Sequence, residues 1–369
     1  MTRPSEAVTA SVTEVPRKLS PASARLFAGL IAFNVLAWLW ALIAFRHFPL
    51  LIGTSLLAYS LGLRHAVDAD HIAAIDNVTR KLMQQGKRPL AAGVFFSLGH
   101  STVVMLATAS IAATALAVES RFRAFRDIGG LIGTSVSALF LFAIGAMNLF
   151  VLRGVWRAFA RVRRGEALHE GDADMLVVAG GPLARVARPL FALIGKSWHM
   201  FPLGFLFGLG FDTATEIGLM GIAASEAARG MPVWSVLVFP VLFAAGMSLI
   251  DTADSLLMVG AYGWAFMKPI RKLYYNLTVT LVSVLIALFV GGVEALGLLA
   301  DRLRLKGGVW DFAGMLSEHF GALGFAIVGV FAVCWLVSAL VYKWRNYDAC
   351  DACDAAPVTP GASRARTAR

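Results

Sequence analysis

The chain has 369 residues, of which 58% are hydrophobic and 15% are charged, and its mean hydropathy is +0.71. A soluble globular domain has about 25% charged residues, so the composition excludes that class and indicates an integral membrane protein. The formal net charge is +10, but basic and aromatic residues are not interleaved, so we expect no nucleic-acid partner. Three cysteines, at positions 334, 350 and 353, are too few for a disulfide framework.

Eight apolar segments are long enough to cross a bilayer, which takes about 20 residues of helix. We therefore predict an all-α polytopic membrane protein with about eight transmembrane helices. The first segment is too long for the core of a signal peptide and is expected to remain as a span. The predicted spans are 26–45, 49–78, 90–118, 128–152, 202–227, 233–263, 276–300 and 321–342.

The segments outside the spans divide the chain into five parts. Residues 1–25 are rich in Pro, Ser, Thr and Ala and are predicted to form a disordered cytoplasmic tail, and residues 343–369 form a second one. Spans 1–4 occupy residues 26–152 and spans 5–8 occupy residues 202–342. Between them, residues 153–201 begin with a cluster of arginines and are predicted to be a basic cytoplasmic loop beside anionic lipid.

The basic residues lie mostly on one side of the predicted membrane. Eight spans place both termini on the same side, together with the segments 79–89, 153–201 and 264–275. That side holds 24 of the 33 Lys and Arg residues. Because cytoplasmic loops are enriched in Lys and Arg, we predict that both termini are cytoplasmic. The lipid bilayer is thus an expected partner.

The second span contains five ionisable side chains within eight residues. An ionisable group inside a membrane costs at least about 2.5 kcal/mol on insertion scales, so the cluster implies a polar cavity with a function. Imidazole nitrogen and carboxylate oxygen together suit a divalent transition metal. The sequence therefore predicts an intramembrane metal site. The five residues are Arg64, His65, Asp68, Asp70 and His71.

Helix geometry restricts which of these groups can bind one ion. On a regular helix His65, Asp68 and His71 lie within about 120° of one face, whereas Asp70 points about 160° away from Asp68. Either the helix is distorted at this motif, or Asp70 orients an imidazole or pairs with Arg64. We favour the first three residues as metal ligands and leave the role of Asp70 open.

Three later spans carry further polar groups. His100, in the third span, is the next candidate ligand. The fifth and sixth spans carry acids spaced three or four residues apart, so that each pair shares a helix face. We predict that these residues complete the site or accept protons as the metal moves. They are Asp212, Thr213 and Glu216 in the fifth span and Asp251 and Asp254 in the sixth.

The predicted cavity is strongly acidic. Counting only groups in the middle of the spans, there are six carboxyl groups, and Arg64 is the one cation assigned to a span. Such a set cannot stay fully ionised in a low-dielectric medium unless water, protons or bound cations balance it. A divalent cation held by carboxylates and imidazoles meets this requirement.

Spans 2 and 3 resemble spans 5 and 6. Gly62-Leu63 precedes the acids of span 2 as Gly208-Leu209 precedes those of span 5. Gly99-His-Ser101 in span 3 is likewise similar to Gly246-Met-Ser248 in span 6. The two pairs cross the predicted membrane in opposite directions, so the sequence predicts an inverted repeat. In carriers built this way the binding site lies between the repeats.

Four motifs in this order resemble the signature of the nickel/cobalt transporter family, the NiCoT permeases, over roughly residues 60 to 260. The resemblance implies uptake of Ni²⁺ or Co²⁺ across the bacterial cytoplasmic (inner) membrane by a single-component carrier. It also implies that the histidines and aspartates of span 2 are essential. The metal would be the transported substrate, and no cofactor is expected. The motifs are Arg64-His-Ala-Val-Asp-Ala-Asp-His-Ile72, Leu98-Gly-His-Ser-Thr-Val-Val104, Leu209-Gly-Phe-Asp-Thr-Ala-Thr-Glu216 and Gly246-Met-Ser-Leu-Ile-Asp-Thr-Ala-Asp254.

Two other functions fit parts of the same motifs. A nickel/cobalt exporter shares some of them but often carries a histidine-rich loop, which seven scattered histidines do not provide. A membrane acyltransferase uses the pattern His65-x4-Asp70, but here the pattern lies within a span and no catalytic domain accompanies it. We therefore expect that the protein is not an enzyme. The sequence has no P-loop motif and implies no ATPase subunit, so coupling to the proton gradient or membrane potential is a hypothesis, which uptake insensitive to an uncoupler would contradict.

Overall fold

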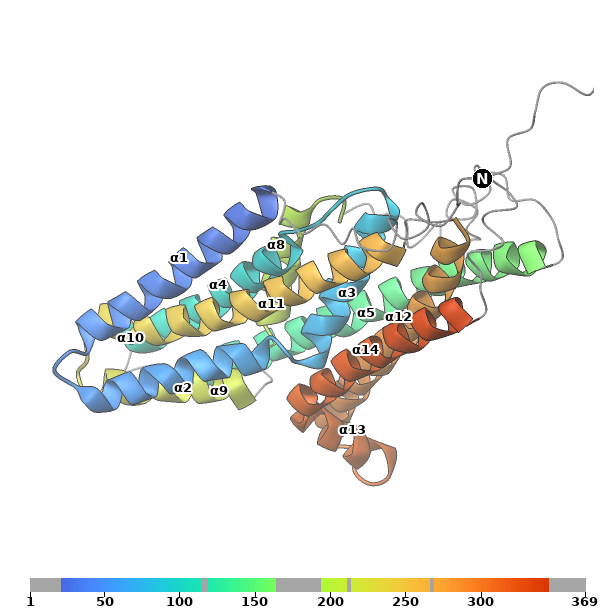
Figure 1. Cartoon of the computed structure of the whole chain (residues 1–369). Coiled ribbons are helices and arrows are strands. Elements are labelled where there is room, and N and C mark those ends of the chain that lie inside the picture. The colour runs from blue at the N-terminus through green and yellow to red at the C-terminus, as the bar shows by residue number, and fades with distance from the viewer. Residues whose placement is uncertain (1–20, 114–118, 164–193, 211–213, 266–268, 345–369) are drawn as a thin grey trace, which may run out of the picture.

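The computed structural model describes residues 21–113, 119–163, 194–210, 214–265 and 269–344 (Figure 1). Every regular element within these ranges is a helix, which confirms the predicted all-α class. Both predicted tails lie largely outside the described residues, as do Asp212 and Thr213. The helices are α1 (Pro21–Ala44), α2 (Pro49–His65), α3 (Ala69–Gln84), α4 (Ala92–Ala113), α5 (Glu119–Arg163), η1 (Ser197–His199), α8 (Met200–Gly208), α9 (Ala214–Ala228), α10 (Val233–Val236), α11 (Val238–Ala265), α12 (Pro269–Leu303), α13 (Val309–Glu318) and α14 (Phe320–Trp344).

Five helical segments in the described part of the chain are long and apolar enough to span a membrane by themselves. Two bent pairs, α2 with α3 and α13 with α14, bring the number to seven if each pair forms one span. The chain is thus a multi-pass membrane protein. The remaining predicted span, the fifth (202–227), corresponds to α8 and α9, two shorter helices on either side of residues 211–213. The count of eight stays a prediction.

The membrane-facing surface and the core have different side chains. α1 exposes a series of large aliphatic residues, among them Ile31, Leu36 and Ile43, as expected of a helix in contact with lipid. A buried apolar cluster instead joins α1, α2 and α11, and a second joins α3, α12 and α14. α3 therefore lies in the interior of the bundle, with α11 and α12 packed against it.

The predicted second span is not one regular helix. α2 ends at His65, α3 begins at Ala69, and the two axes differ by 52° (Figure 1). Asp68, in the link, has an extended backbone with φ −65° and ψ 147° at the N-cap position of α3. Asp68 makes no side-chain capping hydrogen bond, but its carboxylate and that of Asp70 in the first turn suit the positive end of the helix dipole. Of the two alternatives drawn from the sequence, the distorted helix is the one observed.

Matching contacts join α2 to α11 and α8 to α4. A Cβ atom on Gly62 would overlap the carbonyl group of Phe243, and one on Gly204 would overlap that of Phe96. These paired contacts are what a repeat of spans 2–3 and 5–6 would produce. In these contacts Gly62 corresponds to Gly204. The sequence motifs instead align Gly62 with Gly208, which lies one helical turn further along. A twofold axis in the membrane plane stays a prediction.

Two helices continue past the predicted ends of their spans. α3 continues to Gln84, so residues 79–84 are helical rather than part of a loop, because the buried face of α3 extends past its apolar stretch. α5 continues to Arg163, so the first part of the predicted loop 153–201 is also helical. Residues 164–193 lie outside the described residues. α13, with its 83° bend into α14, falls in a segment where no helix was expected.

The extension of α3 carries a cation into the core. Arg80 is only 1% exposed. Its Nη1 donates to Thr280 Oγ1 of α12 at 2.9 Å, and its Nη2 donates to Asn77 Oδ1 at 3.0 Å. Asn148 of α5 donates to the same Asn77 oxygen at 2.6 Å. The Arg80 guanidinium thus joins α3 to α12, and Asn77 extends the network to α5, whereas the sequence had assigned Arg64 as the cation in the spans.

Thr280→Val tests this network. The substitution keeps the shape of the side chain but removes the oxygen that accepts the Arg80 N–H group. An unsatisfied buried donor costs about 1–3 kcal/mol, so the thermal unfolding temperature of the detergent-purified protein should fall. Thr54→Val is the matched control, because the Thr54 hydroxyl bonds the Leu50 carbonyl within its own helix. An unfolding temperature that does not change in Thr280→Val would contradict this role.

Candidate metal centre

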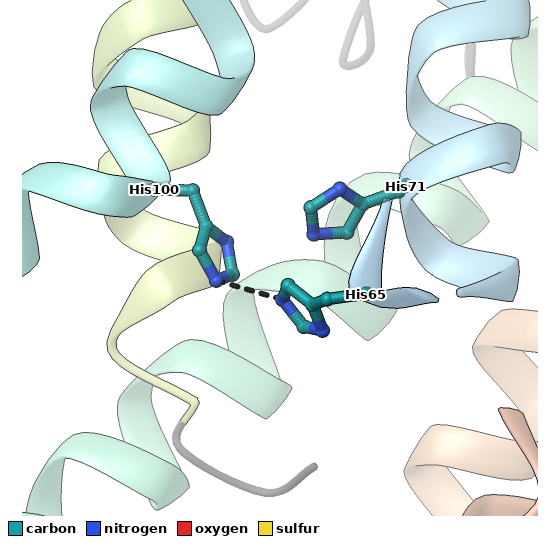
Figure 2. Close-up of side chains that lie close together, drawn as sticks. All are labelled: His65, His71 and His100. Carbon is teal, nitrogen blue, oxygen red and sulfur yellow. Dashed lines mark hydrogen bonds between the residues drawn. The ribbon is translucent and has the colours of Figure 1, made fainter. Parts of the chain in front are cut away.

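Three histidines from three helices converge in the interior of the bundle (Figure 2). His65 ends α2, His71 lies in the first turn of α3, and His100 projects from α4. One ring nitrogen of each lies within 4.8 Å of the other two. Their exposed fractions are 1%, 0% and 2%, so the cluster, which we call the histidine triad, is shielded from solvent.

The break between α2 and α3 makes this convergence feasible. On a continuous helix, residues six positions apart differ by about 9 Å along the axis. Here the ring centroids of His65 and His71 are 4.6 Å apart, and those of His65 and His100 are 4.7 Å apart. The local sequence therefore brings two residues of one motif to the same side of α4.

His65 is held by a neighbouring carboxylate. Its Nδ1 donates to Asp68 Oδ2 at 2.7 Å, and Thr215 Oγ1 of α9 lies 3.1 Å from the same nitrogen. A histidine that donates through Nδ1 keeps the lone pair of Nε2 available to a metal. That Nε2 lies 2.9 Å from His100 Nε2, the contact dashed in Figure 2. Asp68, which we favoured as a ligand, thus lies where it can orient the imidazole of His65.

The other two imidazoles each have a carboxylate from a different helix. His71 Nδ1 lies 3.4 Å from Asp251 Oδ1 of α11, and His100 Nε2 lies 2.9 Å from Glu216 Oε1 of α9. Within the described residues, His71 Nε2 and His100 Nδ1 are buried and have no hydrogen-bond partner. Each imidazole therefore has an acid beside it and retains nitrogen lone-pair capacity for an ion.

Charge balance in the centre requires a cation or protons. Asp68, Glu216 and Asp251 are all buried beside the triad. Removing carboxylates from water is costly unless positive charge accompanies them. A divalent ion coordinated by the neutral imidazoles would supply two positive charges in the middle of the three acids. The arrangement can thus hold a cation while keeping solvent away.

The remaining predicted residues lie around this centre. Asp70 is partly buried in the first turn of α3 and interacts electrostatically with His65. Asp254 lies one turn beyond Asp251 on α11, and its Oδ2 is buried with no hydrogen-bond partner among the described residues. Arg64 is exposed and makes no ion pair within the described ranges.

Several residues that contact the histidine triad were not among the predicted site residues. Thr215, which contacts His65, was not selected, although it lies in the same motif as Glu216. Phe96 packs edge-on against His71 with ring centroids 4.8 Å apart, and its position one turn before His100 was an available signal. Phe243, 5.5 Å from the ring of His65, comes from α11 and had no signal in the sequence.

The geometry of the triad suits a small divalent metal after a modest contraction. Imidazole nitrogens bind such metals at about 2.0–2.1 Å, so two nitrogens at right angles around an ion are about 3 Å apart. His65 Nε2 and His100 Nε2 are already 2.9 Å apart, and the full set of three ring nitrogens, which lie within 4.8 Å of one another, would draw closer on binding. Nitrogen with carboxylate oxygen is a ligand set for borderline metals such as nickel and cobalt.

Fold and site together define a multi-pass membrane protein whose buried histidine cluster fits a transition-metal site. Residues 51–341 match the sequence profile of the high-affinity nickel-transport protein family. The chain belongs to this family, which confirms the resemblance found in its motifs.

Known relatives cover most of the chain. A high-affinity nickel transport protein of Cupriavidus necator is 62% identical over 323 residues, which are 88% of this chain and 92% of that protein. The nickel transporter NicT of Mycobacterium tuberculosis is 48% identical and covers 88% of this chain and 89% of its own. The cobalt transport protein NhlF of Rhodococcus rhodochrous is 41% identical, with coverages of 79% and 83%. No solved structure matches the chain.

Asp68→Ala tests the orienting role of this carboxylate. Loss of a hydrogen-bond partner that orients a metal-binding histidine lowers metal affinity by about 10- to 100-fold. We expect a decrease of this size in nickel affinity, measured by equilibrium binding to the purified protein. Asp311→Ala, which changes an exposed aspartate of α13, should bind as the wild type does. Unchanged affinity in Asp68→Ala would contradict the assignment.

Proposed function

We propose that this protein is a secondary transporter that takes up Ni²⁺ and/or Co²⁺ across the bacterial cytoplasmic membrane through the histidine triad. The observation that carries the proposal is the burial of three imidazoles from α2, α3 and α4, each beside its own carboxylate, in a member of a nickel-transport family. Both nickel and cobalt are included because relatives are named for each of them.

In this proposal the triad supplies the ligands and the acids have supporting roles. His65, His71 and His100 bind the ion through ring nitrogens. Asp68 orients the imidazole of His65, as its 2.7 Å hydrogen bond favours. Asp70, at the edge of the site, either joins the ligands as the ion arrives or adds negative charge.

Acids of the fifth and sixth spans are proposed to line the cation pathway. Asp251 and Glu216 contact triad imidazoles and can stabilise the ion. Asp254, one turn further along α11, offers a buried carboxylate oxygen that could bind the ion after it leaves the triad. Asp212 and Thr213, which immediately precede α9, are proposed to belong to the same pathway.

The metal is proposed to be substrate rather than cofactor, and no cofactor or ATPase subunit is required. An acyltransferase is disfavoured because His65 is 1% exposed and hydrogen-bonded to Asp68, so an acyl donor at the membrane surface would not reach it. An exporter is disfavoured because the named relatives include a high-affinity nickel transport protein and a hydrogenase nickel incorporation protein. The excess of basic residues on one side supports cytoplasmic termini.

Uptake of radioactive nickel and cobalt by cells expressing His71→Ala tests the proposal. Removing one of three nitrogen ligands should lower accumulation at low metal concentration by at least tenfold, at equal protein levels. His319→Ala is the control, because His319 is exposed and bonds the Met315 carbonyl. Wild-type accumulation in His71→Ala would overturn the site. If cells that express the wild-type protein accumulate less metal than cells with the empty vector, the protein is an exporter instead.

A further inference from the structure

α14 packs directly onto the link between α2 and α3, although it contributes no side chain to the triad. A Cβ atom on Gly324 would overlap the Val67 carbonyl group and lie 3.3 Å from the Ala69 nitrogen. A Cβ atom on Gly321 would lie 3.3 Å from Asp68 Oδ1 and 3.4 Å from Arg64 Nε. The backbone of α14 thus contacts the residues that join the two halves of the motif.

The position of α14 is fixed by a buried apolar cluster. Phe320, Ile327 and Phe331 on α14 share this cluster with Ala69 and Ile72 on α3. Helix and link are therefore close-packed, and a change in their separation is transmitted rather than absorbed. The absence of side chains at two positions of α14 allows the approach.

Asp68 transmits this contact to the metal centre. One of its carboxylate oxygens, Oδ1, faces Gly321, and the other accepts the hydrogen bond from His65 at 2.7 Å. The carboxylate is thus confined between α14 and the imidazole. A shift of α14 relative to the link would rotate or displace the His65 ring.

We propose that Gly321 and Gly324 are positioning residues for the metal site, because they set the place of the Val67–Asp68 link and thereby the orientation of His65. The inference rests on the proposed function and extends it to a helix outside the four sequence motifs. Metal ligands must lie within about 0.2 Å of their ideal distances, so a small displacement is enough to weaken binding.

The two glycines should respond differently to alanine. At Gly324 the overlap is with backbone, so α14 and the link must separate. At Gly321 the neighbours are side-chain atoms of Asp68 and Arg64 rather than backbone, so the fold should persist while the Asp68 carboxylate moves by a few tenths of an ångström. Gly321→Ala therefore probes positioning with the least disturbance of packing.

The experiment compares Gly321→Ala and Gly324→Ala with Gly329→Ala, the control on the same helix, where a Cβ atom would meet nothing within 4 Å. The readouts are KM and maximal rate of nickel uptake at equal protein levels, and equilibrium nickel binding to purified protein. Gly329→Ala should match the wild type. Gly321→Ala should raise KM and the dissociation constant about tenfold with little change in maximal rate, as loss of ligand orientation does. Gly324→Ala should have a larger effect.

A double variant separates positioning from general destabilisation. If Gly321 acts through Asp68, Gly321→Ala should have no further effect on nickel binding in the Asp68→Ala background, whereas independent effects would add. Additive losses, or wild-type KM in Gly321→Ala, would overturn the inference. Failure of the wild-type protein to accumulate or bind nickel would instead refute the proposed function.

Discussion

The break after His65 is the constraint on which the metal centre depends. A continuous second span would separate His65 and His71 by about 9 Å along the helix axis. With the link at Ala66–Asp68, both imidazoles reach the same point beside His100. The link also places Asp68 against His65, and it is covered by the close approach of α14. One irregular stretch thus determines ligand position, ligand orientation and the packing of a distant helix.

Electrostatics explains how such a centre can both hold and release an ion. Three buried carboxyl groups accompany the three imidazoles. Imidazole binds soft metals less tightly than a cysteine thiolate does, so the ion is not held irreversibly. The acids make a divalent cation favourable in a region that water does not reach. Two of these acids, Glu216 and Asp251, come from α9 and α11, so relative movement of these helices would change the number of groups near the ion.

The sequence predicted the chemistry of the site better than its geometry. Charged groups in apolar spans are costly, and this cost identified His65, His71 and His100 without any structure. The role of Asp68 could not be predicted, because it depends on a break that periodicity does not report. Arg80 was assigned to a loop because a charged residue after an apolar run normally marks the end of a span. Gly321 and Gly324 gave no signal, since close approach depends on the partner surface.

The most direct test of the account is X-ray absorption spectroscopy at the nickel edge of the purified, nickel-loaded protein. We expect imidazole scattering from about three histidines, with metal–nitrogen distances of about 2.1 Å, and loss of one imidazole in His71→Ala. A coordination shell made only of oxygen, or one unchanged in His71→Ala, would contradict the central claim that the histidine triad binds the transported ion.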